Sequence, residues 1–192
     1  GYLLWRDDSL LRCVTQAGAE DVETLYASGL YAELTRLGLL VPHEELAPSP
    51  DIGTDVRRVL KPQLLPFISY PYEWSTAQLR DAALLTLRIL EISLRYGMML
   101  KDASAFNVAF NGCSPVFIDI LSFTRRIENA AWPGYRQFCE HFLLPLLLSR
   151  DLGEAAPGLL LTWMHGIPLH IGKRMLSWQD RLRPSVAMHI SY

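Results

Sequence analysis

The stretches "LKDASAFN" at residues 100–107 and "VFID" at 116–119 decide the fold prediction for this chain. Between them lies an Asn-Gly pair at 111–112, flanked by apolar runs, which is a strong signal for a tight β-hairpin. A hairpin brings its two ends together, so we expect Asp119, after the second strand, to lie beside Asn107, before the first. Amide and carboxylate oxygens are ligands that suit a hard cation such as Mg²⁺.

Asp102 precedes Asn107 by five residues in the same loop, and we expect it to face the same cleft. A carboxylate in that place can accept the proton of a reacting hydroxyl group. Taken singly, Asp102 and Asn107 also suit ordinary turns, because Asp and Asn are favoured turn residues. The combination of spacing, hairpin and preceding helix favours a functional site.

A long helix leads into this loop. Ser75 and Gln78 have the form of a capping box, and the helix is predicted over 75–96, ending before Gly97. Its expected apolar stripe consists of Leu79, Ala83, Leu87, Leu90 and Leu94. A short strand follows at 98–100.

The remaining sequence predicts a mixture of strands and helices. The expected elements are a hairpin over 1–16, an amphipathic helix over 19–37, a polar loop over 41–55, two short strands within 56–72 with an extended segment at 70–74, and mostly helix over 132–192.

The composition excludes several classes of protein. The chain has 192 residues, of which 50% are hydrophobic and 20% charged, with a net charge of −2, so a general nucleic-acid binder is disfavoured. The three cysteines are scattered without zinc spacing, which fits a reducing, cytoplasmic setting. The sequence shows no signal peptide or transmembrane run, and Pro145 interrupts the most apolar stretch. The start at Gly1 rather than Met points to a segment of a longer protein.

The pattern of Asp, Asn five residues later, a hairpin and a second Asp resembles the catalytic loop and metal-binding aspartate of the protein-kinase-like fold, which includes the aminoglycoside phosphotransferases. The resemblance implies an α+β, reduced two-lobed fold with a thin β-rich N-lobe and a helical C-lobe. The N-lobe would span residues 1–69 and contain a hairpin, a helix and two short strands. The C-lobe would span residues 75–192 and contain the segment at 100–119 that resembles a catalytic loop. Residues 70–74 would be the hinge.

The same resemblance implies roles for individual residues. Asp102 would be the catalytic base, and Asn107 and Asp119 would hold Mg²⁺. Nucleotide contacts are expected from Lys61 and from the hinge region at Ser69 and Tyr70, whose backbone contacts the adenine of ATP in that fold. Either Arg12 or Lys61 would replace the N-lobe lysine, and the N-lobe helix offers Glu20, Glu23 and Glu33 as partners for it.

The chain departs from the kinase pattern in several places. It has no glycine-rich phosphate loop before the hinge, and Ile120 rather than Gly follows Asp119. These departures leave two functions open. The first is a Mg²⁺- and nucleotide-binding domain that either transfers phosphate to an unknown small molecule or regulates an attached methyltransferase. The alternative is a non-catalytic pseudokinase-type scaffold that positions a substrate or partner.

A second resemblance covers nearly the whole chain. The phrases "SGLYAELTRLGLLVPHEE", "PFISYPYEWSTAQLRDAALLTL" and "YRQFCEHFLLPLLL" resemble bacterial proteins usually named SAM-dependent methyltransferases. In those proteins a kinase-like region precedes a separate methyltransferase domain. The resemblance therefore implies an attached domain that would bind SAM, because this chain has no glycine-rich strand-turn-helix segment for that cofactor.

Overall fold

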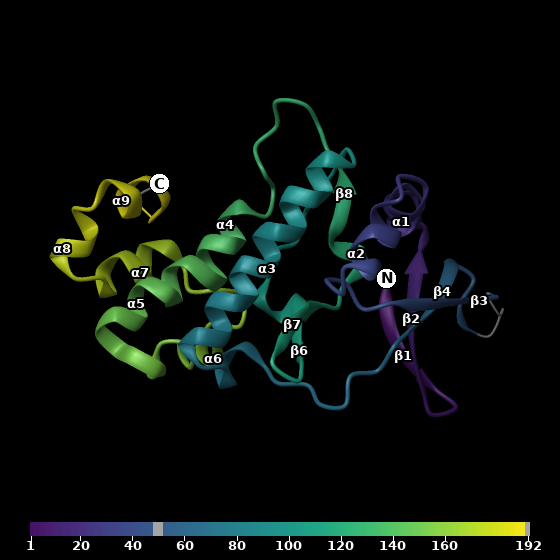
Figure 1. Cartoon of the computed structure of the whole chain (residues 1–192), viewed down its shortest axis with the longest axis horizontal. Coiled ribbons are helices and arrows are strands. Elements are labelled where there is room, and N and C mark those ends of the chain that lie inside the picture. The colour runs from purple at the N-terminus through teal and green to yellow at the C-terminus, as the bar shows by residue number, and fades with distance from the viewer. Residues whose placement is uncertain (48–51, 191–192) are drawn as a thin grey trace.

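The fold is a mixture of helices and small antiparallel sheets, which confirms the α+β class in its broad form (Figure 1). The structure is a computed structural model and describes residues 1–47 and 52–190. The strands are β1 (Tyr2–Arg6), β2 (Ser9–Thr15), β3 (His43–Leu46), β4 (Val56–Pro62), β5 (Met98–Leu100), β6 (Val108–Asn111), β7 (Ser114–Phe117) and β8 (Phe123–Arg125). The α-helices are α1 (Gln16–Ala27), α2 (Leu30–Arg36), α3 (Thr76–Arg95), α4 (Tyr135–Phe138), α5 (Leu144–Leu152), α6 (Leu159–Thr162), α7 (Leu169–Met175), α8 (Trp178–Arg181) and α9 (Pro184–Ile190).

Four strands near the N-terminus form one antiparallel sheet in the order β1-β2-β4-β3. The expected hairpin over 1–16 is confirmed, with its turn at Asp7 and Asp8, both of which have positive φ. β2 leads directly into α1, so the helix begins where the central strand ends. Figure 1 shows this sheet and its helices on one side of α3, and the C-terminal helices α5 to α9 on the other.

The prediction of one helix over 19–37 is wrong in one respect, because the structure has two helices there, α1 and α2. Gly29 adopts φ +83, a left-handed conformation that an α-helix does not contain, and it separates α1 from α2. The chain turns there, and the buried side chains of both helices, such as Leu25 and Leu30, still face the same core.

The prediction for 41–72 also needs correction. β3 lies within the segment that the sequence predicts as a loop, whose residues 48–51 lie outside the described part of the chain. Its charged residues suit an edge strand, and Glu45 pairs with Arg58 across the sheet. Instead of two strands within 56–72 there is one, β4, since Pro62 and Pro66 do not support further pairing. Residues Pro71–Glu73 form a 3-10 helix rather than extended chain.

The long helix is confirmed as α3, with Ser75 as its N-cap and Gly97 following in a left-handed conformation. The face that it buries differs from the predicted stripe, because Leu87 and Leu94 are 40% and 36% exposed. The buried side chains are instead Leu79, Ala82, Ala83, Leu85, Thr86, Ile89, Ile92 and Ser93. The hydroxyls of Thr86 and Ser93 donate to carbonyls four residues earlier, so polar side chains are accommodated in this core.

We expect the capping box to contribute measurably to stability. The Ser75 hydroxyl accepts a hydrogen bond from the backbone N–H of Gln78 at 3.2 Å, and the Gln78 side chain accepts one from the Ser75 N–H at 3.0 Å. Ser75→Ala removes the cap and should lower the free energy of unfolding by about 1 kcal/mol, measured by urea denaturation. Ser114→Ala, at an exposed strand position, should change it by less than about 0.5 kcal/mol. Equal effects of the two substitutions would contradict this account of the helix start.

The predicted hairpin and strand around the candidate loop are confirmed. β6 and β7 pair through a turn in which Gly112 has φ +61, and β5 pairs with β8. The C-terminal region is mostly helical, as predicted, and contains a π-helix over Cys139–Leu143 between α4 and α5. No helix within residues 1–47 and 52–190 is long and apolar enough to cross a membrane.

Candidate functional site

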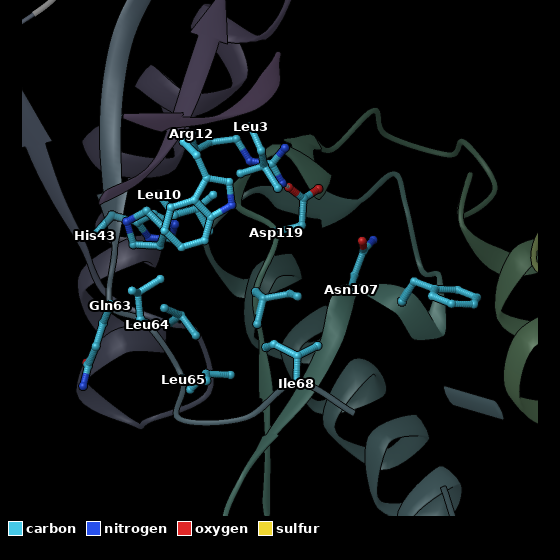
Figure 2. Close-up of a pocket in the computed structure, with 15 residues that line it drawn as sticks. Leu3, Leu10, Arg12, His43, Gln63, Leu64, Leu65, Ile68, Asn107 and Asp119 are labelled. Carbon is cyan, nitrogen blue, oxygen red and sulfur yellow. Dashed lines mark hydrogen bonds and ion pairs between the residues drawn. The ribbon is translucent and has the colours of Figure 1, made fainter. Parts of the chain in front are cut away.

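A cavity of about 410 Å³ lies between the N-terminal sheet and the β6–β7 hairpin. Its walls are mostly apolar: Leu3, Trp5 and Leu10 come from the β1–β2 hairpin, and Leu64, Leu65 and Ile68 from the segment that follows β4. Figure 2 shows Arg12, Asp119 and Asn107 together at one side of this cavity. We call it the first cavity. Its size and its few convergent polar groups are typical of a small-molecule site.

Arg12 on β2 donates a hydrogen bond to Oδ1 of Asp119 and forms an ion pair with it. The two side chains are 19% and 15% exposed, so the pair is partly withdrawn from water. Arg12 comes from the sheet, whereas Asp119 lies two residues after the end of β7, so the pair ties the two sides of the first cavity together. Arg12 places a permanently charged guanidinium at the polar end of a mainly apolar cavity, where the Asp119 carboxylate offsets its charge.

The hairpin brings Asn107 and Asp119 together as the sequence argument expects. The backbone N–H of Ile118 donates to the carbonyl of Asn107 at 2.9 Å, which closes the hairpin at its base. Ser122 then bridges the two side chains: Asn107 Nδ2 donates to its hydroxyl at 3.0 Å, and the hydroxyl donates to Asp119 Oδ2 at 2.6 Å. This bridge leaves Oδ1 of Asn107 without a partner among the described residues.

Asp102 lies on the other side of Asn107. Its Oδ1 accepts a hydrogen bond from the backbone N–H of Ser104 at 2.9 Å, which fixes the turn after β5. It lines a second cavity of about 380 Å³, and Phe106 and Asn107 line both cavities. The polar loop therefore separates two adjoining cavities, with Asp119 in the first and Asp102 in the second.

Lys101 turns away from its neighbour Asp102. Its ammonium pairs with Oδ2 of Asp21 on α1 at 2.5 Å, and Thr124 on β8 donates to the other oxygen of the same carboxylate at 2.9 Å. The backbone N–H of Lys101 donates to the carbonyl of Ser122 at 2.7 Å. These bonds tie α1 to the start of the candidate catalytic loop.

The three residues expected to contact nucleotide lie outside the first cavity. Lys61 is exposed on β4, opposite Glu44, and lines a separate hollow at the sheet edge. The Ser69 hydroxyl accepts a hydrogen bond from the Trp74 indole at 2.9 Å, and the Tyr70 ring stacks on Tyr72 with their centroids 5.5 Å apart. Of the two candidates for the N-lobe lysine, the structure thus brings Arg12, and not Lys61, to Asp119.

The helix glutamates have other partners. Glu23 on α1 pairs with Arg58 of β4, and Glu33 on α2 pairs with Arg36 one turn later. Glu20 is exposed. Within the described ranges, the carboxylate that pairs with Arg12 is Asp119 and not one of these three.

Sequence reasoning missed the residues that form most of the first cavity's wall. His43, on the unpredicted strand β3, lines it, and so do Leu64, Leu65 and Ile68 of the segment after β4. The sequence signal for this segment is weak: it shows only apolar residues on both sides of Pro66, which also suit a short strand.

His141 lies on the π-helix and lines the second cavity. It is 1% exposed, its ring meets Phe106 edge-on with centroids 6.0 Å apart, and its Nδ1 has no hydrogen-bond partner among the described residues. Burial lowers the pKa of His141 from 6.5 to about 4, and the nearby Asp102 carboxylate opposes that shift only in part. The imidazole is therefore neutral at pH 7 and adds no positive charge to the second cavity.

This burial makes stability depend on pH. Because the folded pKa of His141 lies below the unfolded value, the unfolded state binds the extra proton more readily between pH 6.5 and 4. Stability should fall as the pH falls through that window, by about 3 kcal/mol from this one group. Denaturant titrations give the free energy of unfolding at pH 7 and at pH 4. Its decrease between the two pH values should be about 3 kcal/mol smaller in His141→Gln than in the wild type. His170→Gln, at an exposed position, should show the same decrease as the wild type. A wild-type pH profile in His141→Gln would contradict the assignment.

The fold and the site together define this chain as an α+β domain. Its first cavity lies between an antiparallel sheet and a hairpin whose ends carry polar side chains. No family model matches the chain. The chain is 35% identical over 192 residues to a protein named "Nodulation protein NoeA" from Rhizobium meliloti (strain 1021). The match covers 99% of this chain but 40% of that protein, so the chain spans less than half the length of this curated relative. The relative's name mentions nodulation and specifies no reaction.

Proposed function

We propose that this chain is a kinase-like domain that binds a Mg²⁺-nucleotide in the first cavity. The observation that carries the proposal is the ion pair between Arg12 and Asp119. It joins the strand that leads into α1 to the aspartate that follows the β6–β7 hairpin, and those are the two places where the kinase pattern has its lysine and its metal-binding aspartate. The apolar walls suit the base of the nucleotide, and Arg12 suits its phosphates.

The residues at the polar end fit a magnesium ion. Asp119 offers a carboxylate, and Oδ1 of Asn107 is free of other partners among the described residues. Magnesium in proteins commonly takes one or two such ligands and completes its octahedron with phosphate oxygens and water. Arg12 now holds Oδ1 of Asp119, so a bound cation requires the guanidinium to release that oxygen and turn toward the phosphates.

Phosphoryl transfer is the reaction that this arrangement supports best. Asp102 would accept the proton of an acceptor hydroxyl in the second cavity while that oxygen attacks the terminal phosphorus, and the nucleoside diphosphate would leave with the bond's electron pair. Arg12 would offset negative charge on the phosphates. Lys101 would hold the loop that carries Asp102 in place through its ion pair with Asp21 on α1.

A specific observation favours the alternative, a non-catalytic scaffold. The β1–β2 hairpin turns at Asp7 and Asp8, so its tip carries two carboxylates and no glycine. In kinases a glycine-rich loop covers the phosphates with backbone N–H groups, and two negative charges cannot replace it. In this alternative the Arg12–Asp119 pair would close the polar end of the first cavity permanently, and the domain would only position a substrate or partner.

The resemblance to proteins named SAM-dependent methyltransferases supports a further part of the proposal, an attached methyltransferase domain. The relative that matches this chain extends well beyond the matched region, which leaves room for such a domain. SAM would then bind that domain, and the kinase-like region would bind the nucleotide.

Calorimetric titration separates these functions. We expect Mg²⁺-ATP to bind the chain saturably, ATP without Mg²⁺ to bind more weakly, and SAM to give no heat. Absence of binding by Mg²⁺-ATP would contradict the proposal and leave the scaffold function. Saturable binding of SAM by this chain would instead indicate that the chain itself serves the methyl transfer.

A further inference from the structure

The second cavity contains a hydrogen-bond acceptor and a donor that the fold leaves available. Asp102 uses Oδ1 for the N–H of Ser104, and its Oδ2 has no partner in the described part of the chain. Gln137 on α4 uses Oε1 to accept from the backbone N–H of Ala103 at 2.7 Å. That bond fixes the orientation of the amide, and its NH₂ group finds no acceptor among the described residues.

A hydroxyl group matches this pair of groups. It can donate its proton to Asp102 and accept a hydrogen bond from the Gln137 amide at the same time. An ammonium group could pair with the Asp102 carboxylate but has no lone pair for the amide, so it would leave the Gln137 donor unused. An anion would lie against the Asp102 carboxylate, and the buried His141, which is neutral at pH 7, would not offset that repulsion.

The remaining wall combines the aromatic and apolar side chains of Phe106 and Met164 with the polar side chains of Ser104, Asn107 and His165. Phe106 presents its ring between the two cavities, and Met164 lies at the rim, 54% exposed. Phe106 and Met164 can contact the C–H groups of a ligand whose hydroxyls bind the polar residues. The flexible Met164 side chain can adapt to ligands of different shape. The volume of about 380 Å³ is within the range of small-molecule sites.

From these contacts we infer that the second cavity binds an uncharged polyol, with one hydroxyl held between Asp102 and Gln137. The inference names the substrate class of the proposed kinase-like site and in that sense rests on the proposed function. Its test uses no nucleotide, so binding of polyol and binding of Mg²⁺-ATP can fail separately. Gln137 is a specificity-determining residue here, and Asp102 is the group that would receive the proton.

The experiment is an NMR titration of the chain, followed through the side-chain amide of Gln137 and the methyl group of Met164. The probes are methyl β-glucopyranoside and myo-inositol, which are uncharged, and glucose 6-phosphate, which is anionic. We expect the uncharged probes to shift both signals saturably and glucose 6-phosphate to bind at least about tenfold more weakly. No shift with either uncharged probe, or equal binding of glucose 6-phosphate, would overturn the inference.

Two glutamine substitutions sharpen the test. Gln137→Glu keeps the oxygen that accepts from Ala103 but removes the free donor and adds a negative charge, so polyol affinity should fall by about tenfold or more, followed through Met164. Gln179→Glu makes the same change at an exposed position on α8 that lines neither cavity, and it should leave polyol binding unchanged. Equal affinities of wild type and Gln137→Glu would overturn the role of Gln137.

Discussion

Asp119→Ala should weaken the binding of Mg²⁺-ATP by at least about 100-fold, which corresponds to about 2.7 kcal/mol of binding free energy. The substitution removes the carboxylate that the described residues contribute to the proposed Mg²⁺ site. It also leaves Arg12 unpaired at the end of the first cavity, where it is 19% exposed. Calorimetry with Mg²⁺-ATP measures the effect, and circular dichroism checks that the variant is folded.

The matched control for this prediction is Lys61→Ala. Lys61 is the alternative candidate for the phosphate contact, but it lies outside the first cavity on an exposed strand position. Its removal should change the affinity for Mg²⁺-ATP less than about twofold, whereas Arg12→Ala should weaken it by about tenfold or more. If Lys61→Ala were the damaging substitution, or if a folded Asp119→Ala bound as wild type does, the assignment of the first cavity would be wrong.

Asp102→Asn should lower the rate of phosphoryl transfer from Mg²⁺-ATP by about 10²–10⁴-fold, because an amide cannot accept the proton of the acceptor hydroxyl. The binding constant for Mg²⁺-ATP should stay close to that of wild type, since Asp102 lines the second cavity and not the first. Formation of ADP, measured with methyl β-glucopyranoside as the acceptor, gives the rate, and calorimetry gives the affinity.

This pair of measurements separates the kinase-like function from the scaffold. The scaffold predicts no phosphoryl transfer by the wild type, and therefore no change on Asp102→Asn. Asp102→Asn also retains the oxygen that accepts from the Ser104 N–H, so the turn is expected to persist and a lost rate would not reflect a disordered loop. A wild-type rate in Asp102→Asn would exclude Asp102 as the base.

The part of the site that local sequence order determines could be predicted. The Asn-Gly turn sets the register of β6 and β7, and that register alone brings Asp119 beside Asn107. The capping box at Ser75 likewise fixes the start of α3. In each case a few adjacent residues define the geometry, and no distant contact has to be known.

The parts that depend on long-range pairing could not be predicted. Arg12 lies 107 residues from Asp119 in the sequence, and nothing near either residue shows that they meet. The strand β3 is charged and follows a proline, and its pairing with β4 outweighs that local signal. The break at Gly29 depends on how α2 packs, and the buried face of α3 depends on which neighbours cover it.

The most direct test of the central claim replaces Mg²⁺ by paramagnetic Mn²⁺ and locates it by NMR. With Mn²⁺-ATP bound, the side-chain amide of Asn107 and the methyl groups of Ile118 and Ile120 should broaden strongly. Asn107 and Ile118 line the first cavity with Asp119, and Ile120 directly follows Asp119 in the chain. The methyl group of Met188 on α9, among the C-terminal helices, should remain sharp (Figure 1). Broadening that spares Asn107, or that affects Met188 equally, would contradict a Mg²⁺-nucleotide site in the first cavity.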